Sequence, residues 1–198
     1  MPRRSDAKQK MVAAAKQLIR ERGYNGTAFS DVLELSDAPR GSVYFHFPRG
    51  KAQLAIEAAA SHAFDQVEII NQSAHGSRSA AEFIERYLDL GRDGLVASDY
   101  GRGCGIAPLI TDGATRESAE IEESARRAFS ELAERLAFHF IAFGIDGPDA
   151  QALADALFAG MQGALITSRA LRSTAPFDAV KLALVNQANN VPLKGAAH

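Results

Sequence analysis

Residues 38–51 decide the fold and read Ala38-Pro39-Arg40-Gly41-Ser42-Val43-Tyr44-Phe45-His46-Phe47-Pro48-Arg49-Gly50-Lys51. Pro39 fixes its backbone φ and has no N–H to lose, so it fits the first turn of a short helix over residues 40–47. Pro48 ends that helix. Another short helix is predicted just upstream, over residues 28–36, with its apolar residues on one face. Two short helices joined by a tight turn are typical of a helix-turn-helix.

An amphipathic helix over residues 5–22 precedes this pair, with apolar residues on one face and Lys, Arg and Gln opposite. Gly23 suits a left-handed cap at the C-terminal end of this helix. The hydroxyl of Thr27 is expected to cap the N-terminus of the helix that follows. The sequence therefore predicts a three-helix N-terminal domain over residues 1–50.

The rest of the chain keeps the helical spacing and shows no β-strand alternation. Ser79 and Glu82 form a capping box that opens one helix. Further elements are predicted over residues 51–72, 106–111, 115–143, 148–171 and 176–190. The tail from Val191 is expected to fray. The fold class is predicted to be all-α, with about nine helices and a C-terminal helical domain over residues 51–198.

The composition is that of an ordinary globular protein, with 46% hydrophobic and 23% charged residues among 198. No apolar run approaches the ~18 residues of a membrane span and no signal peptide is visible, so a soluble, cytoplasmic protein is expected. Residues 1–51 hold ten Lys/Arg and five Asp/Glu, whereas the remainder holds 12 and 19. This basic head on an acidic body indicates a polyanion as partner, with a solvated charged surface as the alternative.

Two stretches, Gly23–Val32 and Ala38–Lys51, resemble the TetR family of transcriptional regulators, most specifically in the run Gly41-Ser42-Val43-Tyr44-Phe45-His46-Phe47 with Lys51 just beyond. Pro39 and the spacing Phe47-Pro48-Arg49-Gly50-Lys51 look most like the LmrA/YxaF-like branch. That branch also shows a stretch similar to the mid-chain Gly103-Cys104-Gly105-Ile106-Ala107-Pro108. The resemblance implies a homodimeric DNA-binding repressor that reads a palindromic operator and is released by a small apolar or aromatic effector. Ala28 and Pro39 depart from the family pattern, which affects the operator sequence more than DNA binding itself.

The predicted DNA contacts follow from this resemblance and agree with side-chain chemistry. An arginine can reach guanine O6 and N7, and small neighbours let a helix approach the bases of a major groove. Tyr, His and Thr can donate to phosphate oxygens. The DNA-facing set is Thr27, Pro39, Arg40, Gly41, Ser42, Tyr44, His46 and Lys51. Val43 and Phe47 are expected in the core, and Phe45 has no assigned role, with packing against the first helix as one interpretation.

An effector cavity is expected to be mostly apolar with a few polar groups. Its candidate lining residues are His62, Tyr87, Gly91, Cys104, Leu109, Phe129, Phe158, Met161, Gln162 and Leu165. Gly91 and Gly163 are expected to leave space on facing helices. The alternative is that these residues simply form the core. For Cys104 the two interpretations are a redox switch and a buried thiol that only packs. The last two long helices carry apolar residues on more than one face, which indicates an interface with a partner. The family resemblance implies that this partner is a second copy of the chain, in a homodimer.

The other function classes find less support in the residues. An enzyme is not predicted, because no Ser/His/Asp, paired-carboxylate or phosphate-binding glycine motif is present. No cofactor or metal is predicted, because the histidines lack ligand spacing and the single cysteine excludes a four-cysteine site. The remaining alternative is an architectural DNA-binding protein without a ligand, which salt-dependent binding with no sequence preference would favour.

Overall fold

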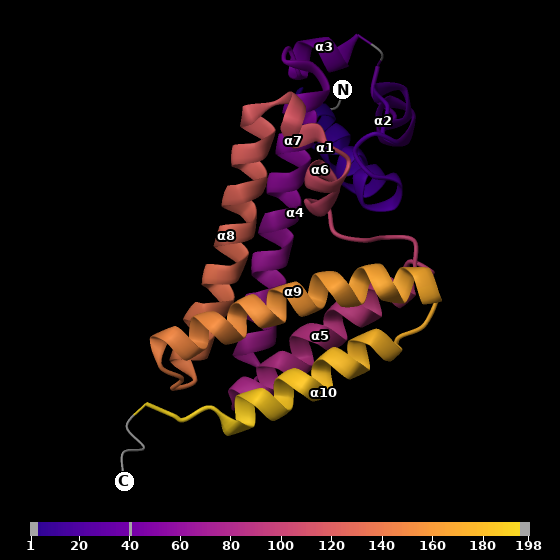
Figure 1. The fold of residues 1–198 in the computed structure, drawn as a ribbon. Helices are drawn as coiled ribbons and strands as arrows, with labels where there is room; N and C mark the ends of the chain where they lie inside the picture. Colours follow the sequence, from indigo (N-terminus) through magenta and orange to yellow (C-terminus); the bar gives the residue numbers. More distant parts are fainter. Residues whose placement is uncertain (1–3, 40, 195–198) are drawn as a thin grey trace. The chain divides into compact units, whose positions relative to one another are not determined.

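The computed structural model describes residues 4–39 and 41–194, and these form helices with no strand (Figure 1). The ten helices are α1 Arg4–Arg22, α2 Phe29–Ser36, α3 Ser42–His46, α4 Gly50–His75, α5 Ala80–Ala97, α6 Ala107–Thr111, α7 Ala114–Glu117, α8 Ala119–Ala142, α9 Gly147–Leu171 and α10 Ala175–Asn190. The predicted all-α fold is confirmed, with ten helices in place of about nine. None of these helices combines the length and apolar character that a membrane crossing needs.

Two predicted helix boundaries are wrong. The single helix expected over residues 115–143 is broken at Ser118, whose extended backbone (φ −149°, ψ 115°) separates α7 from α8. The Ser118 hydroxyl accepts the Ile121 N–H at 3.4 Å, as an N-cap of α8 does. Helix α3 begins only at Ser42, so Pro39 precedes the helix and does not lie in its first turn.

The N-terminus of α5 and the tail after α10 differ in detail from the prediction. Ser79 caps α5 as expected, because its hydroxyl accepts the Glu82 N–H at 3.2 Å. In a capping box the Glu82 carboxylate would accept the N–H of Ser79. It accepts the N–H of the preceding residue, Arg78, at 3.0 Å instead. The tail keeps a contact as far as Lys194, whose N–H donates to the Gly144 carbonyl at 2.6 Å.

The chain divides into two compact units. The first comprises Met1–Asp65 and Cys104–Phe129, and the second comprises Gln66–Gly103 and Ser130–His198. Helices α4 and α8 are each continuous and contribute residues to both units. The units group residues by contact and not by function, so the functional division at residue 50 stays a prediction.

The core of the first unit draws on α1, α2, α3 and α4, and also on α6, α7 and α8. The fully or almost fully buried side chains of α1–α4 and the residue after α3 include Met11, Ala15, Leu18, Ile19, Val32, Val43, Phe47, Leu54, Ala55, Ala58 and Ala59. The apolar face predicted for α1 is therefore confirmed. Gly23 ends α1 with φ +81°, the left-handed conformation expected of a glycine cap.

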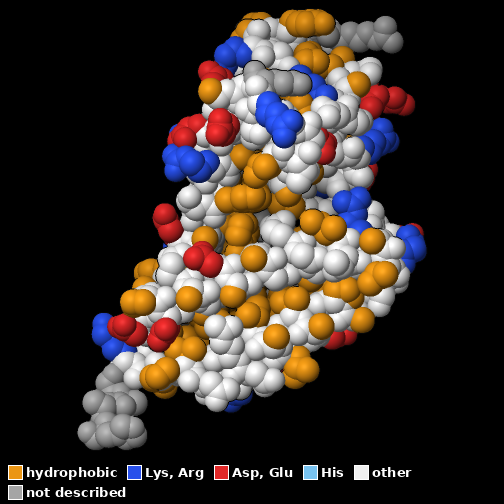
Figure 2. Space-filling view, viewed as in Figure 1, with side chains coloured by type: hydrophobic (Ala, Val, Ile, Leu, Met, Phe, Trp, Pro, Cys, Tyr) orange, Lys and Arg blue, Asp and Glu red, His pale blue; other side chains and the backbone are white. Residues whose placement is uncertain are grey.

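The core of the second unit lies where α5, α9 and α10 pack together. Gly91 of α5 was expected to leave space, and this is wrong. A Cβ at Gly91 would lie 2.7 Å from the Met161 sulfur, so the missing side chain is what lets α9 approach. Phe83 adds an aromatic contact with Phe140 (ring centroids 5.3 Å apart). The outer surfaces of α9 and α10 expose hydrophobic side chains to solvent (Figure 2).

Candidate nucleic-acid interface

Helix α3 turns one face into the core and presents the other to solvent. Val43 and Phe47, four residues apart, are 1% and 0% exposed, which confirms that they are core residues. Tyr44 and Phe45 lie between them in sequence and are 77% and 66% exposed. The packing of Phe45 against α1 stays one interpretation of the covered part of its ring. A short helix held by two buried anchors and carrying two exposed aromatic rings is suited to insertion into a groove.

The segment before α2 differs from the prediction at Thr27. Its side chain is buried, and its hydroxyl donates to the Gly23 carbonyl at 2.7 Å. Helix α2 begins at Phe29 with Ala28 as the N-cap residue, and no side chain caps it. The Thr27 hydroxyl therefore closes the turn that follows α1, and the N-cap position of α2 belongs to Ala28. Asp37, in the left-handed conformation (φ 52°), ends α2 where the sequence predicts a break.

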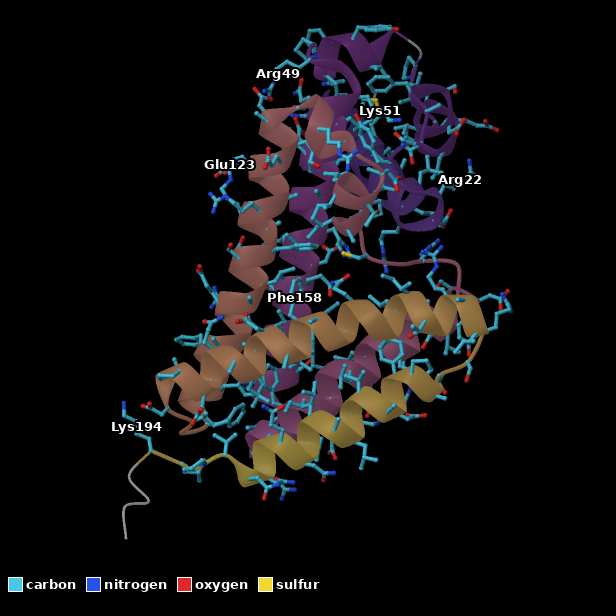
Figure 3. The ribbon with its side chains drawn as sticks, viewed as in Figure 1. Arg22, Arg49, Lys51, Glu123, Phe158 and Lys194 are labelled. Atoms are coloured by element: carbon cyan, nitrogen blue, oxygen red, sulfur yellow. The ribbon has the colours of Figure 1, made fainter. Side chains whose placement is uncertain are left out.

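The remaining predicted DNA contacts fall into three groups. Arg40 and the side chain of Ser42 lie outside the described residues. Pro39 and Gly41 are exposed, and a Cβ on Gly41 would meet no atom within 4 Å, so the surface around it is open. His46 and Lys51 are half-buried, and the Lys51 ammonium lies 4.4 Å from the centre of the Tyr24 ring (Figure 3).

Asp112, just after α6, is a residue that the sequence reasoning missed. Its carboxylate accepts the Tyr24 N–H at 2.7 Å and the Asn25 N–H at 3.3 Å. The Asn25 side chain in turn donates to the Asp112 carbonyl at 2.9 Å. Asp112 thus fixes the turn between α1 and α2. No local pattern could reveal the contact, because the partners are 87 and 88 residues apart in the chain.

Part of the basic charge of α1 is neutralised within the first unit. Lys8 pairs with Glu57 at 2.8 Å and Lys16 with Asp65 at 2.6 Å, both carboxylates belonging to α4. The count of ten basic residues before position 52 therefore overstates the positive charge available to a polyanion.

The candidate effector residues of the first unit are His62, Cys104, Leu109 and Phe129. His62 is buried, and burial, followed by the charge of Arg20, lowers its pKa to about 3. Its Nδ1 has no hydrogen-bond partner among the described residues. The Cys104 sulfur accepts the N–H groups of Ile106 and Ala107 at 3.4 Å each and is half-buried. Leu109 is fully buried.

The other candidates belong to the second unit and differ in how deeply they are buried. Tyr87 and Met161 are buried, whereas Phe158 (Figure 3), Gln162 and Leu165 are half-buried. Gly163 is exposed, with no atom within 4 Å of the place a Cβ would occupy. In the part of the chain that the structure describes, no cluster of three metal-ligating side chains occurs.

Comparison with protein families matches both parts of the chain. Residues 11–58 match the family described as bacterial regulatory proteins, tetR family. Residues 80–183 match the C-terminal domain of LmrA/YxaF-like transcriptional regulators. An uncharacterized helix-turn-helix-type transcriptional regulator of Mycobacterium tuberculosis is 34% identical over 183 residues, which cover 90% of this chain and 92% of that protein.

Solved structures share the fold. A TetR transcriptional regulator from Chloroflexus aurantiacus has a TM-score of 0.77 at 26% identity, and the match covers 98% of this chain and 100% of that one. The TetR-family regulator CifR, complexed with 26-bp double-strand operator DNA, has a TM-score of 0.74 at 18% identity, with 93% and 96% covered. At that identity the second match shows the fold alone.

Proposed function

Since the chain belongs to the TetR family of bacterial regulatory proteins, we propose that it is a homodimeric repressor of the LmrA/YxaF-like kind that binds a palindromic operator. It is a DNA-binding transcriptional regulator and not an enzyme. The observation that carries the proposal is α3, whose core face is anchored by Val43 and Phe47 while its other face is exposed. The protein then works in the cytoplasm, where a bacterial chromosome lies.

The proposed DNA contacts divide by chemistry. Arg40 pairs with guanine O6 and N7, and Gly41 and Ser42 let the helix approach the base edges. Tyr44 donates its hydroxyl to a phosphate, which its exposure supports, and His46 is proposed to contact the same strand backbone. Pro39 and Lys51 complete the set. Thr27 is left with a positioning role, because its hydroxyl is buried and already bonded to Gly23.

The dimer is proposed to form through the outer faces of α9 and α10. One set of exposed residues of α9 recurs every three or four positions, as in a helix that packs against a partner. They are Ala152, Asp155, Ala159, Gly163, Ile166 and Ala170. The small side chains allow close approach of helices, and Ile166 supplies apolar area at 64% exposure. Leu182 of α10 is similarly exposed, at 66%. A two-fold dimer matches the symmetry of a palindromic operator.

Release is proposed to follow binding of a small apolar or aromatic effector. The effector must bind the state with low operator affinity more tightly, and such couplings are typically about 1–3 kcal/mol. Helix α4 supports this mechanism because it is continuous from Gly50 to His75 and connects the DNA-reading helices to the rest of the chain. A ligand-independent architectural protein is the alternative, and it predicts binding without sequence preference.

Gel shifts test the proposal with duplexes selected from a random pool at ~150 mM salt, in the presence of excess unrelated DNA. Non-specific binding is weak under these conditions, with Kd values of about 10⁻⁴–10⁻⁶ M. We expect nanomolar binding to a palindrome, and a loss of about tenfold or more per half-site in Arg40→Ala. Arg78→Ala is the matched control, since this exposed arginine lies in the second unit.

The outcomes separate the alternatives. Palindromic selection with normal Arg78→Ala binding and weak Arg40→Ala binding supports the proposal. Equal binding to all duplexes would instead identify the architectural alternative. Equal losses in both arginine variants would show that general charge, and not the α3 region, produces the affinity.

A further inference from the structure

We propose that Phe45 is a specificity-determining residue whose ring contacts the C5-methyl group of a thymine in the major groove. The inference rests on the proposed function, because it requires α3 to lie against the bases of an operator. Phe45 is the aromatic residue of α3 that the sequence leaves without a role, and the structure exposes 66% of it.

The position of Phe45 on the helix places it opposite the core. Successive residues of a helix are about 100° apart, so Phe45 lies about 200° around the axis from Val43. Val43 is buried, and Phe45 therefore belongs to the outward face of α3. Figure 2 shows hydrophobic side chains exposed over the segment that Figure 1 labels α3. Any surface that receives α3 must meet this ring.

The ring is held in place by its neighbour along the helix. Phe45 and His46 form an edge-to-face contact, with ring centroids 5.1 Å apart and an interplanar angle of 82°. His46 in turn lies 6.4 Å from the ring of buried Phe47. This row of three rings leads from the core to the exposed face. Phe45 is thereby partly ordered before binding, which reduces the entropy lost when it contacts a partner.

The chemistry of a phenyl ring selects its target in a major groove. Phe45 has no donor or acceptor, so it cannot bond to a phosphate oxygen or to the polar edge of a base. The thymine C5-methyl is the apolar group that a base pair presents in the major groove, and phenylalanine is one of the side chains suited to it. The neighbouring Tyr44 carries a hydroxyl, which can donate a hydrogen bond to a phosphate oxygen. The two exposed aromatic residues therefore have separate roles.

Replacing thymine by uracil tests the contact, because this change removes the methyl group and nothing else. The operator is first selected from random duplexes with the wild-type protein, and each thymine is then replaced in turn by deoxyuridine. We expect one thymine per half-site at which wild-type affinity falls about fourfold, the value for one buried methyl-sized group. Phe45→Ala removes the ring from both half-sites of the dimer, so it is expected to bind the natural operator about 16-fold or more weakly, with no further loss on that replacement.

The controls separate the ring from the fold and from its neighbour. Tyr44→Phe should keep the full uracil effect, because it removes only the hydroxyl. Phe45→Leu should keep part of it, because leucine retains apolar contact. Circular dichroism melts of each variant confirm that the helices are intact. If the combined loss of affinity from Phe45→Ala and the uracil replacement is smaller than the sum of the two separate losses, the ring and the methyl group are in direct contact.

Three results would overturn the inference while leaving the repressor in place. Phe45→Ala could bind the operator as tightly as the wild type, which would leave the ring free for a protein partner. It could weaken every duplex equally, which would place the ring on the sugar backbone. It could also show undiminished uracil effects at all positions. A wild-type protein that selects no duplex would overturn the proposed function and this inference together.

Discussion

His62 holds a neutral imidazole inside the first unit, and this determines how its contribution to stability depends on pH. Burial, with the charge of Arg20 second, lowers the pKa of His62 from 6.5 to about 3. Between these values the unfolded chain binds a proton that the folded chain does not. The contribution is therefore complete above about pH 6.5 and is lost as the pH falls towards 3. At pH 5 the loss amounts to about 2 kcal/mol.

We expect His62→Phe to reduce this pH dependence, since phenylalanine fills a similar volume and does not titrate. The measurement is the free energy of unfolding in urea at pH 7 and pH 5, at one protein concentration because the stability of the proposed dimer would depend on it. His75→Phe, at the exposed C-terminal end of α4, is the control and should keep the wild-type difference. If His62→Phe loses as much stability as the wild type between the two pH values, another group is responsible.

At the scale of elements, the turn between α1 and α2 depends on Gly23 and Asp112 together. Gly23 has φ +81°, and a Cβ there would lie 2.5 Å from the Asp112 carboxylate oxygen that holds the turn. Gly113 has nearly the same φ, +82°, with no atom within 4 Å of such a Cβ. Alanine at either position would pay the same cost of a left-handed backbone. Only at Gly23 would its Cβ also clash with the Asp112 carboxylate.

Alanine substitution of each glycine therefore separates backbone strain from the role of Asp112. We expect Gly113→Ala to cost about 1–2 kcal/mol of unfolding free energy, from the left-handed backbone alone. Gly23→Ala should cost about 1–3 kcal/mol more, because the carboxylate must leave the N–H groups of Tyr24 and Asn25. Urea denaturation of the two variants side by side gives the difference. Equal costs would show that Asp112 does not stabilise the turn.

The elements that the sequence predicts well are those whose signals are local. Ser79 and Gly23 mark helix ends by their own chemistry, and periodic apolar residues mark the helices between them. The break at Ser118 was missed because no Gly or Pro interrupts the period there, although a serine N-cap was available as a signal. Asp112 could not be found, because its partners are adjacent only after folding.

The candidate site was predictable where local sequence spacing determines it, and not where contacts form only on folding. The apolar spacing of Val43 and Phe47 sets the core face of α3, so the exposure of Phe45 follows from the helical period. The state of Thr27 does not follow, because a hydroxyl before a helix suits an N-cap as well as the turn it closes. Net charge was also an incomplete guide, since Lys8 and Lys16 are paired with carboxylates of α4.

At the scale of the whole molecule, operator affinity should depend on the proposed dimer face of α9 and α10. A carboxylate at the centre of an apolar interface is buried without a partner, which costs several kcal/mol. We expect Ile166→Glu to sediment as a monomer at about 10 μM protein and to lose at least ~30-fold in operator affinity, as for the loss of an interface hot spot. Phe138→Glu is the matched control, because Phe138 on α8 is an apolar residue of similar exposure, and this variant should remain a dimer with normal binding. If Ile166→Glu stays dimeric while Phe138→Glu does not, the dimer face lies on α8 and the assignment to α9 and α10 is wrong.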